Sequence, residues 1–103
     1  MMSNFLLELA KKIETQKNED VRKSYTSFLL SKGFEECLLK FKEEAEEFSE
    51  AIQNNKSIIH ESADVIYHLL VTLESRGIKF TDVIKELEKR KNQSGLEEKK
   101  SRK

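Results

Sequence analysis

Four carboxylates stand in two pairs with the same spacing, Glu44 with Glu47 and Glu61 with Asp64. Residues three positions apart lie on one edge of an α-helix, so each pair can present its side chains together. Carboxylate oxygens suit Mg²⁺ or Mn²⁺ better than Zn²⁺ or copper. A divalent cation held there can bridge phosphate oxygens, neutralise developing charge and lower the pKa of a bound water. The pattern therefore points to metal-dependent chemistry on phosphates.

The second pair lies in a largely apolar stretch, residues 58–73, that contains no lysine or arginine. We expect this stretch to form a largely buried helix. Two buried carboxylates need a cation, which is either a lysine or arginine from elsewhere or a bound metal. If the segments on either side of a turn at residues 54–56 form an antiparallel helix pair, the two acidic edges can face one another.

The first pair also has a plainer explanation. Lys40 with Glu44 and Lys42 with Glu46 are spaced four residues apart, which is typical of solvated ion pairs on a helix surface. Another alternative is a helical dimerisation module whose acidic edges only keep it in solution. Mg²⁺ would then leave its thermal stability unchanged, whereas a cation that binds only the folded state raises it.

The remaining reactive residue types suggest no other catalytic arrangement. The sequence has no glycine-rich phosphate loop and supports no Ser-His-Asp or Cys-His arrangement. His68 is expected to be a hydrogen-bonded core residue or a neighbour of the ligands, and His60 a surface residue. Cys37, the single cysteine, cannot form an internal disulfide and is expected to fill space in the core.

Hydrophobic periodicity predicts an all-α fold of four to five helices. The absence of proline and the presence of only three glycines favour long helices. Ser57 and Thr81 are predicted N-caps, and Gly33 and Gly77 are predicted to end helices. The expected helices are residues 5–17, 21–31, 34–53 and 58–75, with a fifth that follows Thr81.

The length of 103 residues fits one domain, predicted as residues 1–92 with a charged tail at 93–103. So short a chain buries a small core, and we expect a second copy to complete the helical bundle as a homodimer. The 19 basic and 19 acidic residues balance, which argues against nucleic-acid and membrane partners. A cytoplasmic location is expected because no signal-like or membrane-length apolar segment occurs.

Several sequence blocks follow one another in a characteristic order. They are Ser24-Tyr25-Thr26, the Lys32-Gly33 pair, a K-x-x-E-E-A-x-E block at residues 40–47, an E-x-x-D block at residues 61–64, and Ser94-Gly95-Leu96-Glu97-Glu98-Lys99. Together they resemble the phosphoribosyl-ATP pyrophosphatases, members of the wider MazG-like all-α nucleotide pyrophosphohydrolases. The resemblance covers nearly the whole chain.

The resemblance implies hydrolysis of 1-(5-phospho-β-D-ribosyl)-ATP to the corresponding AMP derivative and pyrophosphate, the second step of histidine biosynthesis. It also implies Mg²⁺ as cofactor and a homodimer. By matching positions it makes Glu44, Glu47, Glu61 and Asp64 the metal ligands, with Glu43 beside them as a further catalytic residue. The positions expected to contact the nucleotide substrate are Lys40, Tyr25, Lys32, Arg90, Ser94, Gly95, Lys99 and Arg102.

The main alternative of the same superfamily is a house-cleaning enzyme that hydrolyses free or damaged nucleoside triphosphates, because it would use the same carboxylates. The Ser-Tyr-Thr, Lys-Gly and Ser-Gly-x-x-Glu-Lys blocks lie outside the shared metal motif and favour the histidine pathway. Gln16 and Asp20-Val21 depart from the arginine and the Asp-Pro pair that the narrower family often has there.

Overall fold

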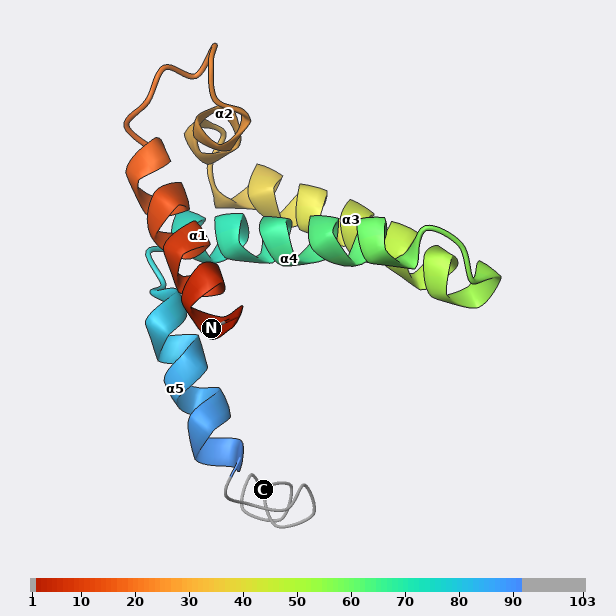
Figure 1. Ribbon diagram of the computed structural model, residues 1–103. Helices are drawn as coiled ribbons and strands as arrows, with labels where there is room; N and C mark the ends of the chain where they lie inside the picture. Colours follow the sequence, from red (N-terminus) through yellow and green to blue (C-terminus); the bar gives the residue numbers. More distant parts are fainter. Residues whose placement is uncertain (1, 92–103) are drawn as a thin grey trace.

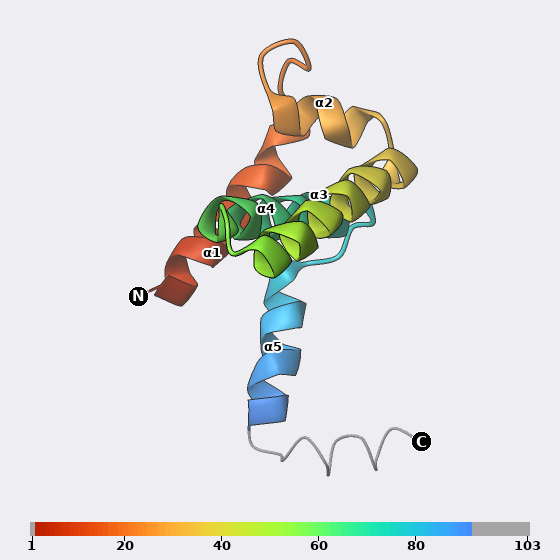
Figure 2. The ribbon, with the colours of Figure 1, turned by 90° about the vertical axis from the view of Figure 1, so that its right-hand side faces the viewer.

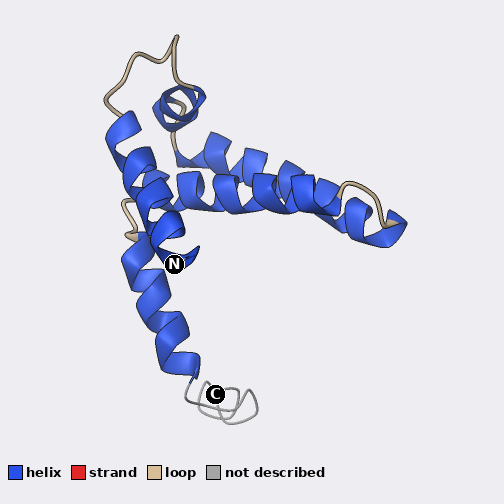
Figure 3. Cartoon of the chain, viewed as in Figure 1, coloured by secondary structure: helices blue, strands red, loops and turns tan. Residues whose placement is uncertain are grey.

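The computed structural model describes residues 2–91, with side-chain surroundings from residue 4 onward, as five helices joined by short loops (Figures 1 and 3). No strand occurs in this part of the chain, which confirms the all-α prediction. None of the described helices combines the length and apolarity that a membrane span requires. The predicted tail at residues 93–103 lies outside the described residues. The helices are α1 (Met2–Gln16), α2 (Tyr25–Ser31), α3 (Phe34–Asn54), α4 (Ile58–Ser75) and α5 (Phe80–Lys91).

Helix α2 begins at Tyr25, later than the predicted start at residue 21. The Asp20 carboxylate accepts a hydrogen bond from the backbone N–H of Arg22 at 2.9 Å and holds the preceding segment in a turn. Ser24 then caps the helix, because its backbone is extended and its Oγ accepts a hydrogen bond from the Ser27 N–H at 3.0 Å. Polar side chains that bond to nearby backbone groups favour turns and caps over helix interiors, which the hydrophobic pattern alone does not register.

Two predicted N-caps are wrong in detail. Ser57 occupies the N-cap position of α4, but its backbone is left-handed (φ 59°) and its side chain makes no capping hydrogen bond. A capping side chain requires an extended backbone at that position, and the tight turn with left-handed Asn55 does not provide one. Helix α5 begins at Phe80, so Thr81 lies inside the helix rather than before it.

Helices α3 and α4 lie side by side as an antiparallel hairpin, and α1 packs across the C-terminal half of α4 (Figure 1). The buried core takes side chains from four helices. Within it the Cys37 thiol donates a hydrogen bond to the carbonyl oxygen of Leu29 at 3.3 Å, and burial raises the pKa of that thiol. Cys37 therefore fills space in the core, as the sequence predicted. The core residues are Ile13, Leu29, Cys37, Leu70 and Val71.

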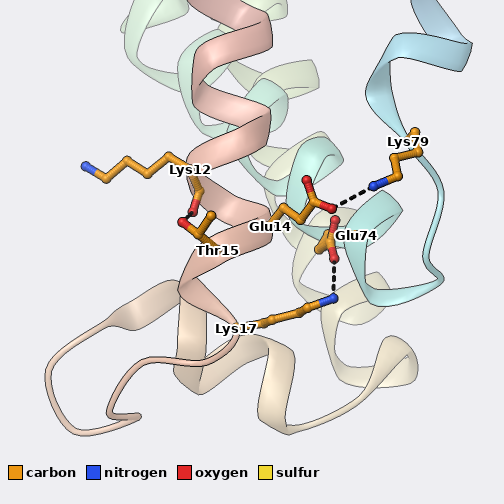
Figure 4. A network of polar contacts seen from close by, with 6 residues as sticks. All are labelled: Lys12, Glu14, Thr15, Lys17, Glu74 and Lys79. Atoms are coloured by element: carbon orange, nitrogen blue, oxygen red, sulfur yellow. Dashed lines mark hydrogen bonds and ion pairs between the residues drawn. The ribbon is translucent and has the colours of Figure 1, made fainter.

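Two ion pairs tie α1 to the far end of α4 and to the loop that follows it (Figure 4). Lys17 Nζ lies 3.3 Å from Glu74 Oε2, and Lys79 Nζ lies 2.7 Å from Glu14 Oε2. The Lys79 ammonium holds the pKa of the Glu14 carboxyl below its ordinary value, chiefly through the hydrogen bond between them. Ion pairs at the surface such as these contribute little to stability.

The N-terminal half of α4 packs against α3 but is only partly buried, contrary to the prediction of a largely buried helix. Ile59 is 87% exposed and Ile66 is 42% exposed, and Ile52 on the facing end of α3 is 50% exposed. Helix α1 reaches only the C-terminal half of α4, so the free end of the hairpin has no apolar partner within the described chain. Helix α5 contributes no cover either, because it projects away from the hairpin (Figures 1 and 2) and buries none of its residues.

Candidate active site

Three of the four predicted ligands converge between α3 and α4, and the fourth, Asp64, groups with Glu61 and His60 on α4. Carboxylate oxygens of Glu44, Glu47 and Glu61 lie within 4.8 Å of one another, and a second group of the same compactness joins Glu61 to Asp64 and His60. Glu61 belongs to both groups and is the centre of the cluster. The i, i+3 spacing places each pair on one helix edge, and the antiparallel hairpin turns the two edges toward each other. The clustering of these side chains agrees with the sequence prediction.

Two oxygens of this cluster are buried and unsatisfied. Oε1 of Glu44 and Oε1 of Glu61 are shielded from solvent and have no hydrogen-bond partner. Within residues 4–91 no lysine or arginine forms an ion pair with Glu44, Glu47, Glu61 or Asp64. Of the two solvated pairs considered above, Lys40 with Glu44 does not form, because Lys40 Nζ pairs with Glu43 Oε1 at 3.5 Å, and no ion pair joins Lys42 to Glu46 within residues 4–91.

Glu44 lies partly buried among other carboxylates, and its pKa is raised as a result. Burial raises the pKa of this carboxyl above its ordinary value, and the neighbouring charge of Glu47 raises it further, with smaller contributions from Asp64 and Glu61. A raised carboxyl pKa means that the folded chain disfavours the ionised form. The donor set is oxygen-rich, crowded and short of positive charge, which fits a hard divalent cation such as Mg²⁺ or Mn²⁺.

A hollow of about 390 Å³ opens beside this cluster at the free end of the hairpin. Its lining includes Glu47, Glu61 and also Lys56, which sequence reasoning did not single out. Lys56 lies in the turn between α3 and α4, and nothing in the surrounding sequence marks it as a site residue. Only the packing of the hairpin shows that its ammonium borders the same space as the carboxylates.

Two tyrosine rings pack around His68, which follows Asp64 by one helical turn. Tyr25 from α2 stacks on Tyr67 from α4, with ring centroids 6.3 Å apart, and both rings meet His68 edge-on. Tyr25 is 53% exposed, so one face of its ring is open to a ligand. His68 is buried, as expected for a core residue or a neighbour of the ligands, and His60 is exposed at the surface, as predicted.

The remaining predicted substrate contacts are spread over the molecule. Lys32 ends α2, where its ammonium lies over the Phe28 ring at 5.1 Å from the centroid. Arg90 Nε lies 3.0 Å from Glu86 Oε2 near the end of α5, which projects away from the hairpin in Figure 1. The structure does not bring Arg90 to the carboxylate cluster within one chain. Ser94, Gly95, Lys99 and Arg102 lie outside the described residues.

Comparison with known proteins gives one consistent result. The family model described as phosphoribosyl-ATP pyrophosphohydrolase matches residues 6–91, which include all five described helices except the start of α1. A phosphoribosyl-ATP pyrophosphatase of Paracoccus denitrificans is 46% identical over 100 residues, covering 95% of this chain and 93% of the relative. Phosphoribosyl-ATP pyrophosphatase 1 of Bradyrhizobium diazoefficiens is 47% identical over 98 residues, covering 93% of this chain and 92% of the relative. The sequence blocks, the paired acidic helices and these relatives agree, and the chain belongs to the phosphoribosyl-ATP pyrophosphohydrolase family.

Proposed function

We propose that this chain hydrolyses phosphoribosyl-ATP to phosphoribosyl-AMP and pyrophosphate in histidine biosynthesis, with Mg²⁺ held by Glu44, Glu47, Glu61 and Asp64. Family membership supports the reaction and its substrate. One observation supports the cation: the buried Oε1 atoms of Glu44 and Glu61 have no partner in the described chain. A buried carboxylate oxygen without a partner is costly, and a divalent cation would satisfy both oxygens at once.

The four proposed ligands differ in how far their side chains are exposed to solvent. Glu44 and Glu61 hold the inner side of the site with their buried oxygens, whereas Glu47 is exposed and the Asp64 side chain is 36% exposed. When bound, Mg²⁺ supplies positive charge for the phosphate oxygens and lowers the pKa of a bound water. Glu43 lies beside the ligands and holds Lys40, which orients that ammonium at the rim.

The substrate brings more negative charge than the ligand cluster can accept without further cations. Lys56 lines the hollow beside the cluster and Lys40 precedes Glu44 by one helical turn on α3, and both would neutralise phosphate charge. The open face of Tyr25 would pack against an apolar or aromatic part of the nucleotide. Lys32 and Arg90 remain proposed contacts, together with Ser94, Gly95, Lys99 and Arg102 of the tail.

We also propose a homodimer, supported by the bare apolar surface on the free end of the α3–α4 hairpin. Ile52, Ile59 and Ile66 are 50%, 87% and 42% exposed on these two helices. A second copy of the chain would bury this surface and complete the bundle. A cytoplasmic location is proposed as well, and the balanced charge of the sequence argues against a nucleic-acid or membrane partner.

Side-by-side assays with phosphoribosyl-ATP and dATP test the reaction and its cofactor. The full chain should release pyrophosphate from phosphoribosyl-ATP in Mg²⁺, should lose this activity in a chelator, and should turn over dATP much more slowly. Preference for dATP would favour a house-cleaning enzyme of the same superfamily. Activity that survives thorough removal of divalent cations would contradict the proposed metal site.

A further inference from the structure

The third buried group without a partner is a nitrogen. His68 is 6% exposed, and its Nε2 is shielded from solvent and has no hydrogen-bond partner within the described chain. Its other ring nitrogen, Nδ1, lies 2.9 Å from the carbonyl oxygen of Asp64. A carbonyl oxygen only accepts hydrogen bonds, so Nδ1 must carry the hydrogen. In the neutral ring Nε2 is then a pure acceptor with a free lone pair.

Neighbouring rings fix the direction of this lone pair. The Tyr67 ring meets the imidazole at 89° with centroids 5.0 Å apart, and the Tyr25 ring meets it at 74° and 6.2 Å. The Tyr67 hydroxyl is itself held by a hydrogen bond with the Thr26 hydroxyl. Rotation of the imidazole would break the Asp64 hydrogen bond and these edge contacts together, so the ring is set in one orientation.

The imidazole belongs to the surroundings of the carboxylate cluster. It follows Asp64 by one helical turn, and its Nδ1 lies 2.9 Å from the Asp64 carbonyl oxygen, so the ring lies against a residue of the cluster. A divalent cation would bind the carboxylate oxygens, but it cannot donate a hydrogen bond to Nε2 of His68. No hydroxyl or N–H of the described chain supplies one. The missing donor therefore lies outside the described residues, and water is the smallest group that could supply it.

We infer that His68 is a positioning residue of this active site: its Nε2 accepts a hydrogen bond from a water bound in the carboxylate cluster and so fixes the orientation of that water. The inference rests on the proposed cation site, because a water held by a cation turns its hydrogens away from that cation. Partners of this kind orient what the ligands hold, and their loss typically costs about 10- to 100-fold in activity or metal affinity.

Nitrogen-15 NMR on the labelled full chain tests the acceptor directly, with Mg²⁺ alone as the probe. The sequence has only two histidines, so a His60→Asn variant assigns both rings. In the neutral ring we expect His68 to carry its hydrogen on Nδ1 and not on Nε2, and we expect the Nε2 signal to shift when Mg²⁺ is added. Protonation on Nε2 in the neutral ring, or an Nε2 signal indifferent to Mg²⁺, would overturn the inference whether or not the assay for hydrolysis succeeds.

Kinetics provide the second test. His68→Phe keeps a flat ring but removes the acceptor, and we expect kcat to fall about 10- to 100-fold with KM changed much less. His68→Gln can place an amide oxygen near the Nε2 position and should recover part of kcat. Thr72→Val is the matched control, because the Thr72 hydroxyl bonds to the His68 carbonyl oxygen at 2.7 Å but not to its ring.

The control separates positioning from general destabilisation. Thr72→Val should lower thermal stability while kcat stays near that of the parent chain. All variants should still be stabilised by Mg²⁺, whereas Glu61→Gln should lose that response, so failure of the metal site and failure of the His68 role give different results. Equal kcat in the His68→Phe variant and the parent chain would show that Nε2 positions nothing in the reaction.

Discussion

At the scale of single residues, the carboxylates proposed to bind the cation lie close enough to repel one another when no cation is bound. Glu47→Gln and Asp64→Asn each remove one charge from the cluster with little change in volume, and both should lower kcat by more than about 100-fold. In metal-free solution the same variants should unfold at the same or a higher temperature, because repulsion among the carboxylates is relieved.

The control for this prediction is Glu46→Gln, an exposed neighbour on the same helix that belongs to neither acidic group. Its activity and melting temperature should match the parent chain. Circular dichroism checks that the helices persist, and a titration with Mg²⁺ at limiting concentrations checks the ligand assignment. Near-normal turnover by both ligand variants under those conditions would refute the assignment.

At the scale of helices, the junction between α2 and α3 depends on a backbone that only glycine adopts easily. Gly33 has φ 93° and ψ 170°, and no atom lies within 4 Å of where a Cβ would stand. The cost of Gly33→Ala is therefore backbone strain rather than a clash, and we expect about 1–3 kcal/mol of lost stability in urea unfolding. Gly77→Asn, at φ 72° after α4, should cost less, because asparagine tolerates the left-handed region. Equal losses at both positions would contradict this explanation.

The attachment of α1 to the loop before α5 should depend on pH. A carboxyl whose folded-state pKa is lowered, as for Glu14 beside Lys79, stabilises the fold above its unfolded value of about 4.3. That contribution is lost as the pH falls through the lower folded value. Glu14→Gln should reduce the melting temperature at neutral pH by no more than about 5 °C, and the difference should vanish in acid. A difference that persists or grows in acid would show that Glu14 acts through packing and not through its charge.

The charged segment after α5 is expected to bind substrate. A chain truncated after Asn92 should keep its Mg²⁺-dependent thermal stabilisation, because the carboxylate cluster lies on α3 and α4. Its KM for phosphoribosyl-ATP should rise strongly, because the removed residues include the cations Lys99 and Arg102. If the truncated chain hydrolyses phosphoribosyl-ATP with unchanged kinetics, the tail is only a solvated end.

At the scale of the whole molecule, the exposed isoleucines of α3 and α4 support the proposed homodimer. Light scattering of the full chain at micromolar concentration should therefore give the mass of a dimer. Ile59→Lys combined with Ile66→Lys places two charges on the N-terminal half of α4 and should shift the protein to monomers. Val21→Lys, on an exposed apolar residue of the loop before α2, should leave the mass unchanged. A fully active monomer of the parent chain would refute the dimer.

The sequence by itself determined the features that depend on local geometry. Helical periodicity of 3.6 residues places Glu44 with Glu47, and Glu61 with Asp64, on single edges whatever the helices later contact. The same periodicity predicted four of the five helix regions closely, because apolar residues recur where a helix face is buried. It failed at the start of α2, where the bonds of Asp20 and Ser24 to nearby backbone groups outweigh the hydrophobic pattern.

Tertiary structure decided what depends on contacts between distant residues. Glu61 is shared by two acidic groups only because the hairpin sets the register of α3 against α4. Which half of α4 is covered follows from where α1 crosses it. The free lone pair of His68 depends on rings from α2 and α4 that close around the imidazole. A single sequence lists the groups that can form hydrogen bonds, but the packing of α2 on the hairpin decides which of them are left without a partner.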